Sequence, residues 1–296
     1  MSDYNVKNCV ASLSNTGLSN CKDELGPTGK LLWTSDTYEI ADYATSILEA
    51  TWVDDIDAKN IYPMPYAEEV ETNIEDNVVQ ETAKGARIFV REGKIAETLK
   101  FRVALCDLPK LRTFNNVSGR VFTVTEDGAI WGTSPDGTKF KGFALSDFHI
   151  SAMGGTDGST ARMVELSYQM KYTDELADHP AVVWPTWTAL DLSGLVDCTV
   201  TVDSSAAGSV VLSVARDCDG EAVDGLVVGD FTILASDGTT QMLPGDSFAD
   251  NADGTYTFGF TTPVLPNDTY TANLKTAAAG TTGGYAPGTA DSFTIS

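Results

Sequence analysis

Two histidines, five cysteines and many carboxylates are the side chains with which this chain could do chemistry. His149 lies in an apolar, strand-like stretch, which favours a structural histidine over a proton shuttle. His179 precedes Pro180 in a segment that we expect to be exposed. Two histidines without closely spaced cysteines do not supply the ligands of a typical zinc centre, so a zinc site is disfavoured.

Glycine-rich and paired acidic stretches give no stronger signal. Residues 154–158 lack the Lys-Ser or Lys-Thr pair with which a phosphate-binding loop contacts phosphate and magnesium, so a hairpin tip is the better interpretation. Glu68 and Glu69 could in principle serve a glycosidase. Acidic residues are so frequent in this chain that their adjacency carries almost no information.

Two stretches resemble the start of a calcium-binding loop. Residues 217–221 and 250–254 carry Asp, but neither continues to the bidentate Glu that closes such a loop. Asp-Gly turns are the favoured interpretation, with calcium as the alternative. Cys198 and Cys218 are expected on neighbouring strands without a disulfide. We therefore assign no catalytic, cofactor-binding or metal-binding residue, and we expect that the protein is not an enzyme.

The length and charge of the chain limit the number of domains and the kinds of partner that we expect. A chain of 296 residues predicts two domains, and 42% hydrophobic residues suffice for packed cores. The net charge is -23: residues 196–296 contain thirteen acids against Arg216 and Lys275, which gives -11 and leaves -12 for the rest. An acidic surface repels nucleic acid and anionic membranes. It serves solubility, or it lets DNA slide past without sticking.

Targeting signals are not evident in the sequence. The N-terminus has no apolar segment after a basic start, and no run of about 18 apolar residues follows anywhere in the chain. The sequence therefore predicts synthesis and folding in a cytoplasm, with no membrane partner.

Three elements are expected in the first third of the chain. Residues 1–30 are polar and read as an extended N-terminal arm. Apolar spacing predicts a helix over residues 37–51, opened by a capping box of Asp36 and Glu39. Residues 52–84 are rich in acids and contain two prolines, which predicts a long acidic loop or an edge hairpin.

The middle of the chain is predicted to be mainly β. Alternating or turn-bounded strands are expected at residues 87–91, 98–105, 119–125, 129–132, 139–145, 148–150 and 164–170. A single helical turn is expected at residues 108–112. Residues 176–195 contain prolines and tryptophans and read as an extended connection.

The last hundred residues form short Thr- and Val-rich strands separated by Gly, Asp and Asn. They resemble the bacterial and phage immunoglobulin-like domain, through residues 222–226, 230–233, 253–257, 267–271 and 291–295. The expected organisation is an arm at 1–30, a β-sandwich or barrel with one helix and a long acidic loop at 31–194, and an immunoglobulin-like β-sandwich at 195–296. All five tryptophans precede the second domain, which supports two distinct cores.

The first two-thirds of the chain resemble a structural protein of tailed phages, most closely a tail tube subunit of the kind carried by phages of Bacteroidetes. The resemblance lies in residues 12–18 with Cys21, in residues 111–115 before the hairpin at Val121, and in residues 172–176. It implies stacked rings, which are hexameric in such proteins, with a lumen that conducts DNA without binding it. It also implies an outward immunoglobulin-like domain.

This resemblance leads to one functional hypothesis and three alternatives. We expect a virion protein of the phage tail, assembled in the host cytoplasm, whose partners are copies of itself and other tail proteins, with DNA passing through. A capsid decoration protein or capsid subunit is the main rival. A bacterial surface adhesin or carbohydrate-binding module is the third hypothesis. A hydrolase with a binding appendage is the fourth, and it lacks a catalytic constellation.

Overall fold

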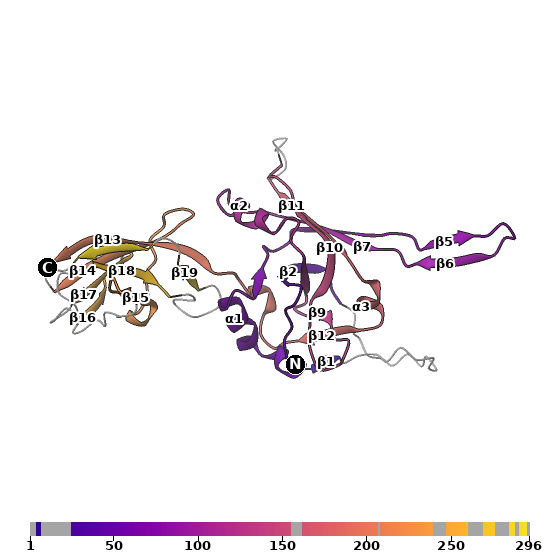
Figure 1. Ribbon diagram of the computed structural model, residues 1–296, viewed down its shortest axis with the longest axis horizontal. Helices are drawn as coiled ribbons and strands as arrows, with labels where there is room; N and C mark the ends of the chain where they lie inside the picture. Colours follow the sequence, from indigo (N-terminus) through magenta and orange to yellow (C-terminus); the bar gives the residue numbers. More distant parts are fainter. Residues whose placement is uncertain are drawn as a thin grey trace. The chain divides into compact units, whose positions relative to one another are not determined.

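The computed structural model describes residues 4–6, 25–154, 162–206, 208–238, 247–259, 269–275, 284–287 and 290–294. The chain divides into two compact units, Met1–Leu192 and Ser193–Ser296, and both are built mainly from antiparallel strands (Figure 1). The expected fold class, mainly β, is therefore confirmed. The division falls two residues before the boundary expected from the composition.

The first unit is built around one long, curved sheet. Its strands lie in the order β1 (Tyr4–Val6), β12 (Pro180–Trp184), β9 (Ile130–Thr133), β8 (Gly119–Thr125), β10 (Phe143–Ile150), β11 (Val164–Met170), β7 (Ile95–Phe101) and β4 (Glu69–Ile74). Strand β2 (Thr28–Ser35) pairs with β8 and with β3 (Ile61–Pro63). The hairpin expected at residues 119–132 is confirmed as β8 and β9, with Gly128 at φ 91° in the turn between them.

Strands β2 and β8 lie between two hydrophobic cores, so both of their faces are buried. Leu31 and Val121 contribute to one core, and Leu32 and Phe122 to the other. The first core lies against the strands β10, β11 and β7, and the second packs against helix α1 (Glu49–Asp57). Strands buried on both faces read as continuous apolar runs and not as an alternation.

Helices in the first unit are short. The described residues contain α1, α2 (Asp107–Leu111) and α3 (Thr173–Ala177), with 3-10 turns η1 (Tyr43–Ile47), η2 (Arg112–Phe114) and η3 (Ala189–Asp191). The helical turn expected at residues 108–112 is confirmed as α2. The expectation of one helix is wrong.

The helix predicted at residues 37–51 is displaced toward the C-terminus. Ile40 exchanges backbone hydrogen bonds with Phe140 in an isolated β-bridge, so residues 37–42 do not form helical turns, and helical structure begins at Tyr43 with η1. The capping box is wrong too: Glu39 accepts from Lys139 and forms a second ion pair with Lys141. A true N-cap lies at Asp42, whose side chain accepts from the amide of Ala44.

The two ends of this unit are more ordered than expected. Residues 28–30, predicted to belong to an arm, begin β2, and residues 4–6 pair with β12; residues 7–24 of the expected arm lie outside the described residues. The predicted connection at 176–195 instead contains β12, which is part of the sheet. The buried Lys30 ammonium donates to the carbonyls of Leu190 and Leu192 at 2.7 Å each. Burial lowers its pKa, against the raising effect of Asp191.

The acidic stretch at residues 52–84 is not one loop. It contains most of α1, then β3, β4 and β5 (Val78–Glu81), and β5 pairs with β6 (Arg87–Arg91) to form a two-stranded ribbon. The alternative of an edge hairpin is therefore right for its second half. The strand expected at 87–91 is confirmed as β6. Two hydrogen bonds connect the strands between the ribbon and the β4–β7 pair. The amide of Glu75 donates to the backbone carbonyl of Lys94, and the amide of Gly93 donates to the side-chain oxygen of Asn77.

Gly93→Ala should loosen the root of this ribbon. A Cβ at this position would lie 1.6 Å from the carbonyl oxygen of Glu75, so the backbone must shift. Such overpacking costs about 1–3 kcal/mol. We expect faster amide hydrogen exchange in residues 78–81 and 87–91. Gly229→Ala is the matched control, because nothing lies within 4 Å of that position. Unchanged exchange in the ribbon of the Gly93 variant would contradict the prediction.

The second unit is a sandwich of two sheets. One has the order β16 (Ser247–Asp250), β17 (Thr255–Gly259), β14 (Ser209–Arg216), β13 (Val196–Ala206) and β19 (Tyr285–Pro287), and the other has β15 (Phe231–Leu234), β18 (Thr269–Leu274) and β20 (Asp291–Thr294). A short 3-10 turn, η4 (Val228–Asp230), precedes β15. Cys198 is buried in the core between the sheets and is not part of a disulfide, so the expectation that Cys198 and Cys218 form no disulfide is confirmed.

Tyr256 links β17 to the segment that precedes η4. Its hydroxyl donates to the carbonyl of Val223 and accepts from the amide of Leu226. Burial raises the pKa of Tyr256 from 10.0 to about 12, against the lowering effect of the Leu226 amide.

The second unit should therefore lose stability in alkali. Because the folded pKa is raised, this contribution of Tyr256 is present below pH 10 and is lost as the pH rises through about 12. Tyr256→Phe should reduce this pH dependence. Urea titrations followed by far-UV circular dichroism would measure it, with tryptophan fluorescence as the internal control, since all five tryptophans lie in the first unit. An equal alkaline loss in the phenylalanine variant would contradict the prediction.

Candidate functional site

One face of the sheet β10–β11–β7–β4 carries polar side chains, while its other face packs against the core. Phe148, Leu166 and Leu99 are buried, and their neighbours along each strand lie on the opposite, accessible face. The register places one row of that face across four strands: His149, Ser167, Thr98 and Glu71. A polar surface is therefore assembled from segments that are far apart in the sequence.

This polar face, defined by the outward residues of β10, β11, β7 and β4, has an acidic excess. Apart from Asp147, which borders the hollow beside β10, its carboxylates are Glu165, Glu69 and Glu71, and its ammonium group is Lys100, which gives a formal charge of -3 + 1 = -2. Lys100 Nζ lies 2.9 Å from Glu69, and this hydrogen bond raises the pKa of Lys100. Exposed ion pairs of this kind contribute about 0–1 kcal/mol to the free energy of folding, so this pair adds little to the stability of the unit.

A partly buried hydrogen-bond network around Glu97 joins four strands of this unit. Glu97 accepts from the hydroxyl of Tyr168 at 2.6 Å and from Thr28 at 3.2 Å, and Thr72 donates to it at 3.3 Å. The network joins β2, β4, β7 and β11, and burial raises the pKa of Tyr168. These partners make Glu97 a structural carboxylate that fixes the polar face in place.

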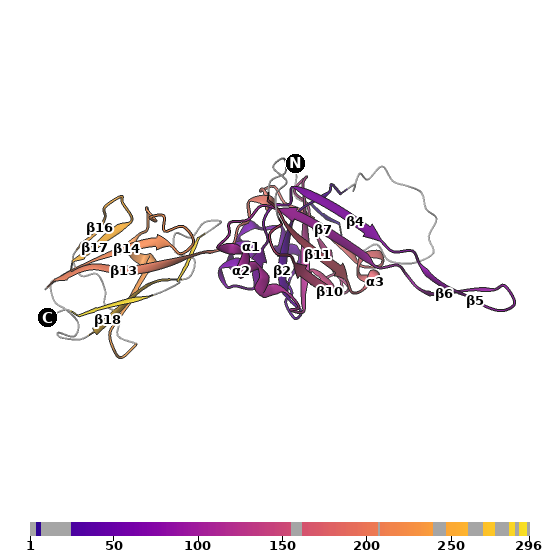
Figure 2. The same cartoon turned by 90° about the horizontal axis from the view of Figure 1, so that it is seen from above.

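The β5–β6 ribbon extends beyond the sheets of the first unit (Figures 1 and 2). Every residue of both strands is exposed. Its apolar side chains are nevertheless large: Phe89 is 56% exposed, Val90 55% and Ile88 51%. Contiguous exposed apolar side chains of this kind mark an interaction surface.

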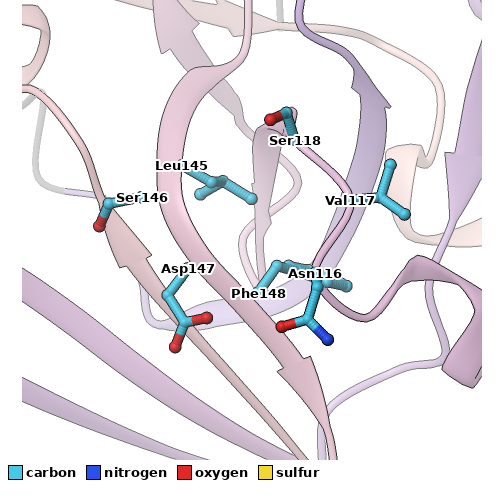
Figure 3. A pocket seen from close by; sticks show the side chains of 7 residues that line it. All are labelled: Asn116, Val117, Ser118, Leu145, Ser146, Asp147 and Phe148. Carbon is cyan, nitrogen blue, oxygen red and sulfur yellow. The ribbon is translucent and has the colours of Figure 1, made fainter.

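A small hollow lies beside β10. A β-bulge between Leu145 and Asp147 opens it, and the loop at residues 116–118 forms its other wall. Asn115 fixes that loop by hydrogen-bonding both the amide and the carbonyl of Ile150, and Asn116 adopts φ 61°. The hollow has a volume of about 220 Å³, with Asp147 and Asn116 at its edge (Figure 3).

The structure places the two histidines in different surroundings. His149 is exposed on the polar face, because Phe148 and Ile150 on either side of it point into the core, and its interpretation as a structural histidine stays a prediction. His179 is half-buried, and its carbonyl accepts from Thr133 and Ser134, so the expectation of an exposed segment is wrong there.

The two calcium-like stretches form turns, and their carboxylates accept hydrogen bonds from within the turn and from one neighbouring segment. Asp219 accepts from Arg216 and from the amide of Glu221. Asp250 accepts from the amides of Gly225 and Ala252, and Asp253 accepts from the amide of Thr255. The interpretation as turns is confirmed.

The remaining candidates do not converge. Glu68 pairs with Arg102, and Glu69 pairs with Lys100, so both carboxylates of the supposed glycosidase pair have cationic partners. Most of the glycine-rich stretch at 154–158 lies outside the described residues. The sequence predicted the hairpin and the strand of the ribbon, but not that their apolar side chains are exposed, and it did not predict the hollow. Alternation of polar and apolar residues at 87–91 does not tell a buried strand from an exposed one.

Comparisons with known proteins add no identity: no family model matches the chain, and no curated protein matches it either. Among the described residues, no helix has both the length and the apolar character needed to cross a membrane.

Proposed function

We propose that the protein is a structural subunit of a phage tail tube, which assembles into stacked rings with an acidic lumen that conducts DNA. The polar face of β10–β11–β7–β4 is the observation that supports the proposal best. A wide, rigid sheet with a hydrated acidic face suits a lumen wall, because even a few Lys or Arg contacts to phosphate would retain DNA. Six copies of this face, each with a charge of -2, would repel the passing strand.

Two further observations agree with assembly. Strand β4 forms the edge of the sheet in the described residues, and an edge strand offers unpaired backbone groups to a neighbour. The β5–β6 ribbon exposes apolar side chains that a monomer gains nothing from exposing. In this proposal the second unit lies on the outside of the tube, the partners are further copies and other tail proteins, and no residue is catalytic.

Electron microscopy tests the proposal directly. The purified protein should form rings or stacked tubes with an open lumen when it is examined by negative stain over a range of concentration and salt. A capsid decoration protein would remain a monomer or a small oligomer, and an adhesin would bind a glycan as a monomer. Small particles under every condition would count against the tube.

Glu71→Lys should turn a tube that ignores DNA into one that binds it. Glu71 is exposed at the edge of the polar face, and the substitution replaces a negative charge with a positive one, which changes the net charge of each subunit by +2. Retention should weaken steeply as salt is raised, because counterions are released on phosphate binding. Mobility of fluorescent DNA in the presence of assembled tubes would measure it. Asp224→Lys, an equal charge change on the second unit, is the control. Equal DNA binding by both variants would contradict the lumen assignment.

A further inference from the structure

The β5–β6 ribbon differs from the rest of the chain in charge. Residues 78–91 contain Lys84, Arg87 and Arg91 against Glu81, which gives +3 - 1 = +2, while the whole chain carries -23. The ribbon is therefore a basic, apolar projection from an acidic protein. Because the ribbon is basic and the rest of the chain is acidic, another copy of the same chain offers a surface of complementary charge to this ribbon.

One face of the ribbon combines an aromatic side chain with a cation. Val79 pairs with Phe89, and Glu81 pairs with Arg87, so these four side chains lie on the same face. Phe89 and Arg87 are two residues apart, which separates them by roughly 7 Å along the strand. Aromatic and Arg side chains carry most of the energy in protein interfaces.

The hollow beside β10 has complementary features. Its floor is formed by Leu145 and Phe148, and the half-exposed Val117 lies on its wall. Asp147 supplies a carboxylate at the edge, and the bulge turns that residue outward. At about 220 Å³ the hollow is smaller than the roughly 300–1,000 Å³ of pockets for drug-sized ligands, so it suits a single side chain.

We infer that the β5–β6 ribbon of one copy docks on the hollow of another copy, with Phe89 over Leu145 and Val117 and Arg87 paired with Asp147. The inference rests on the proposed function, since it supplies the contact through which copies associate. The ribbon and the hollow are different surfaces of the same chain. Such a head-to-tail contact repeats from copy to copy and generates a ring or a filament.

A charge exchange tests the pairing. Arg87→Asp and Asp147→Arg should each raise the concentration needed for half-assembly by about tenfold or more, as loss of a central interface residue does. The combination of both substitutions should restore assembly. Sedimentation velocity over a concentration series would measure it. Phe89→Ser should weaken assembly similarly, and unchanged tryptophan fluorescence would show that the first unit remains folded.

The control variant is Arg112→Glu, which makes an equal change of charge at an exposed residue outside the ribbon. It should leave assembly unchanged. Tubes that form normally in the Arg87 and Phe89 variants would overturn this inference and leave the proposed function standing. Failure of the double variant to recover would overturn the pairing of Arg87 with Asp147. A wild-type chain that stays monomeric throughout would overturn both the inference and the proposed function.

Discussion

Trp52→Ala is expected to lower the free energy of unfolding of the first unit by about 3–5 kcal/mol, the cost typical of removing a large aromatic side chain from a core. Trp52 is fully buried, and its ring packs edge-on against Phe122 at a centroid distance of 5.1 Å. Its indole N–H donates to the carbonyl of Ser46 at 2.7 Å. The substitution would leave a cavity and an unsatisfied carbonyl between α1 and the sheet.

Urea unfolding followed by the fluorescence of the remaining tryptophans would measure this loss. Trp187→Ala is the matched control, because Trp187 also donates its indole N–H to a nearby carbonyl, that of Ile47, but is only half-buried. It removes one fluorophore at a smaller cost in stability. Equal losses in the two variants would show that burial in this core does not determine the effect.

Trp52 also shows where the sequence was informative and where it was not. The apolar spacing predicted a helix over residues 37–51, and only residues 43–47 and 49–51 of that range are helical. It did not show that Ile40 pairs with Phe140, a hundred residues away. With that long-range pairing, residues 37–42 are not helical, and Trp52 and Ile56 provide the buried face of α1. The spacing of apolar residues within one segment does not reveal that the segment pairs with a distant part of the chain.

Turn chemistry was more reliable than composition. The Asp-Gly turn at residues 127–128 correctly predicted the β8–β9 hairpin, because the turn geometry is set by the local residues. Prolines and tryptophans at 180–187 suggested a connection, yet Pro180 begins β12, a position where its missing N–H is tolerated. The composition of a segment does not show where each proline or tryptophan lies in the sheet, and that position determines its role.

The polar face could not have been predicted from any single segment. Acidic residues at 68–71 were evident, but their neighbours on this face, Asp147 and Glu165, come from strands that the sequence places far away. The acids at 54–57 belong to α1 instead and do not join the face. Only the register of four strands distinguishes a clustered charge from a scattered one, and that register is a tertiary property.

Glu175→Ala is expected to destabilise the first unit by about 3–5 kcal/mol, because removing one partner of a buried ion pair leaves the other charge uncompensated. Glu175 lies on α3, and its carboxylate contacts Arg120 on β8 at 2.6 Å and accepts from the amide of Ala144 at 2.9 Å. The two side chains are only 13% and 12% exposed. Arg120 also donates to the carbonyl of Gly142, so the pair joins α3 to two strands.

Replacement of both partners separates the penalty of a stranded charge from the loss of packing. Arg120→Met combined with Glu175→Leu should recover much of the stability lost in Glu175→Ala, since apolar replacements of a buried pair are often neutral. Tryptophan fluorescence in urea would compare the variants with the unsubstituted chain. Disruption of the surface pair Arg91–Glu75, which is roughly half exposed on both sides, should cost far less and is the control. A double variant less stable than the single one would mean that hydrogen bonds to Ala144 and Gly142, more than the buried charge, hold α3 on the sheet.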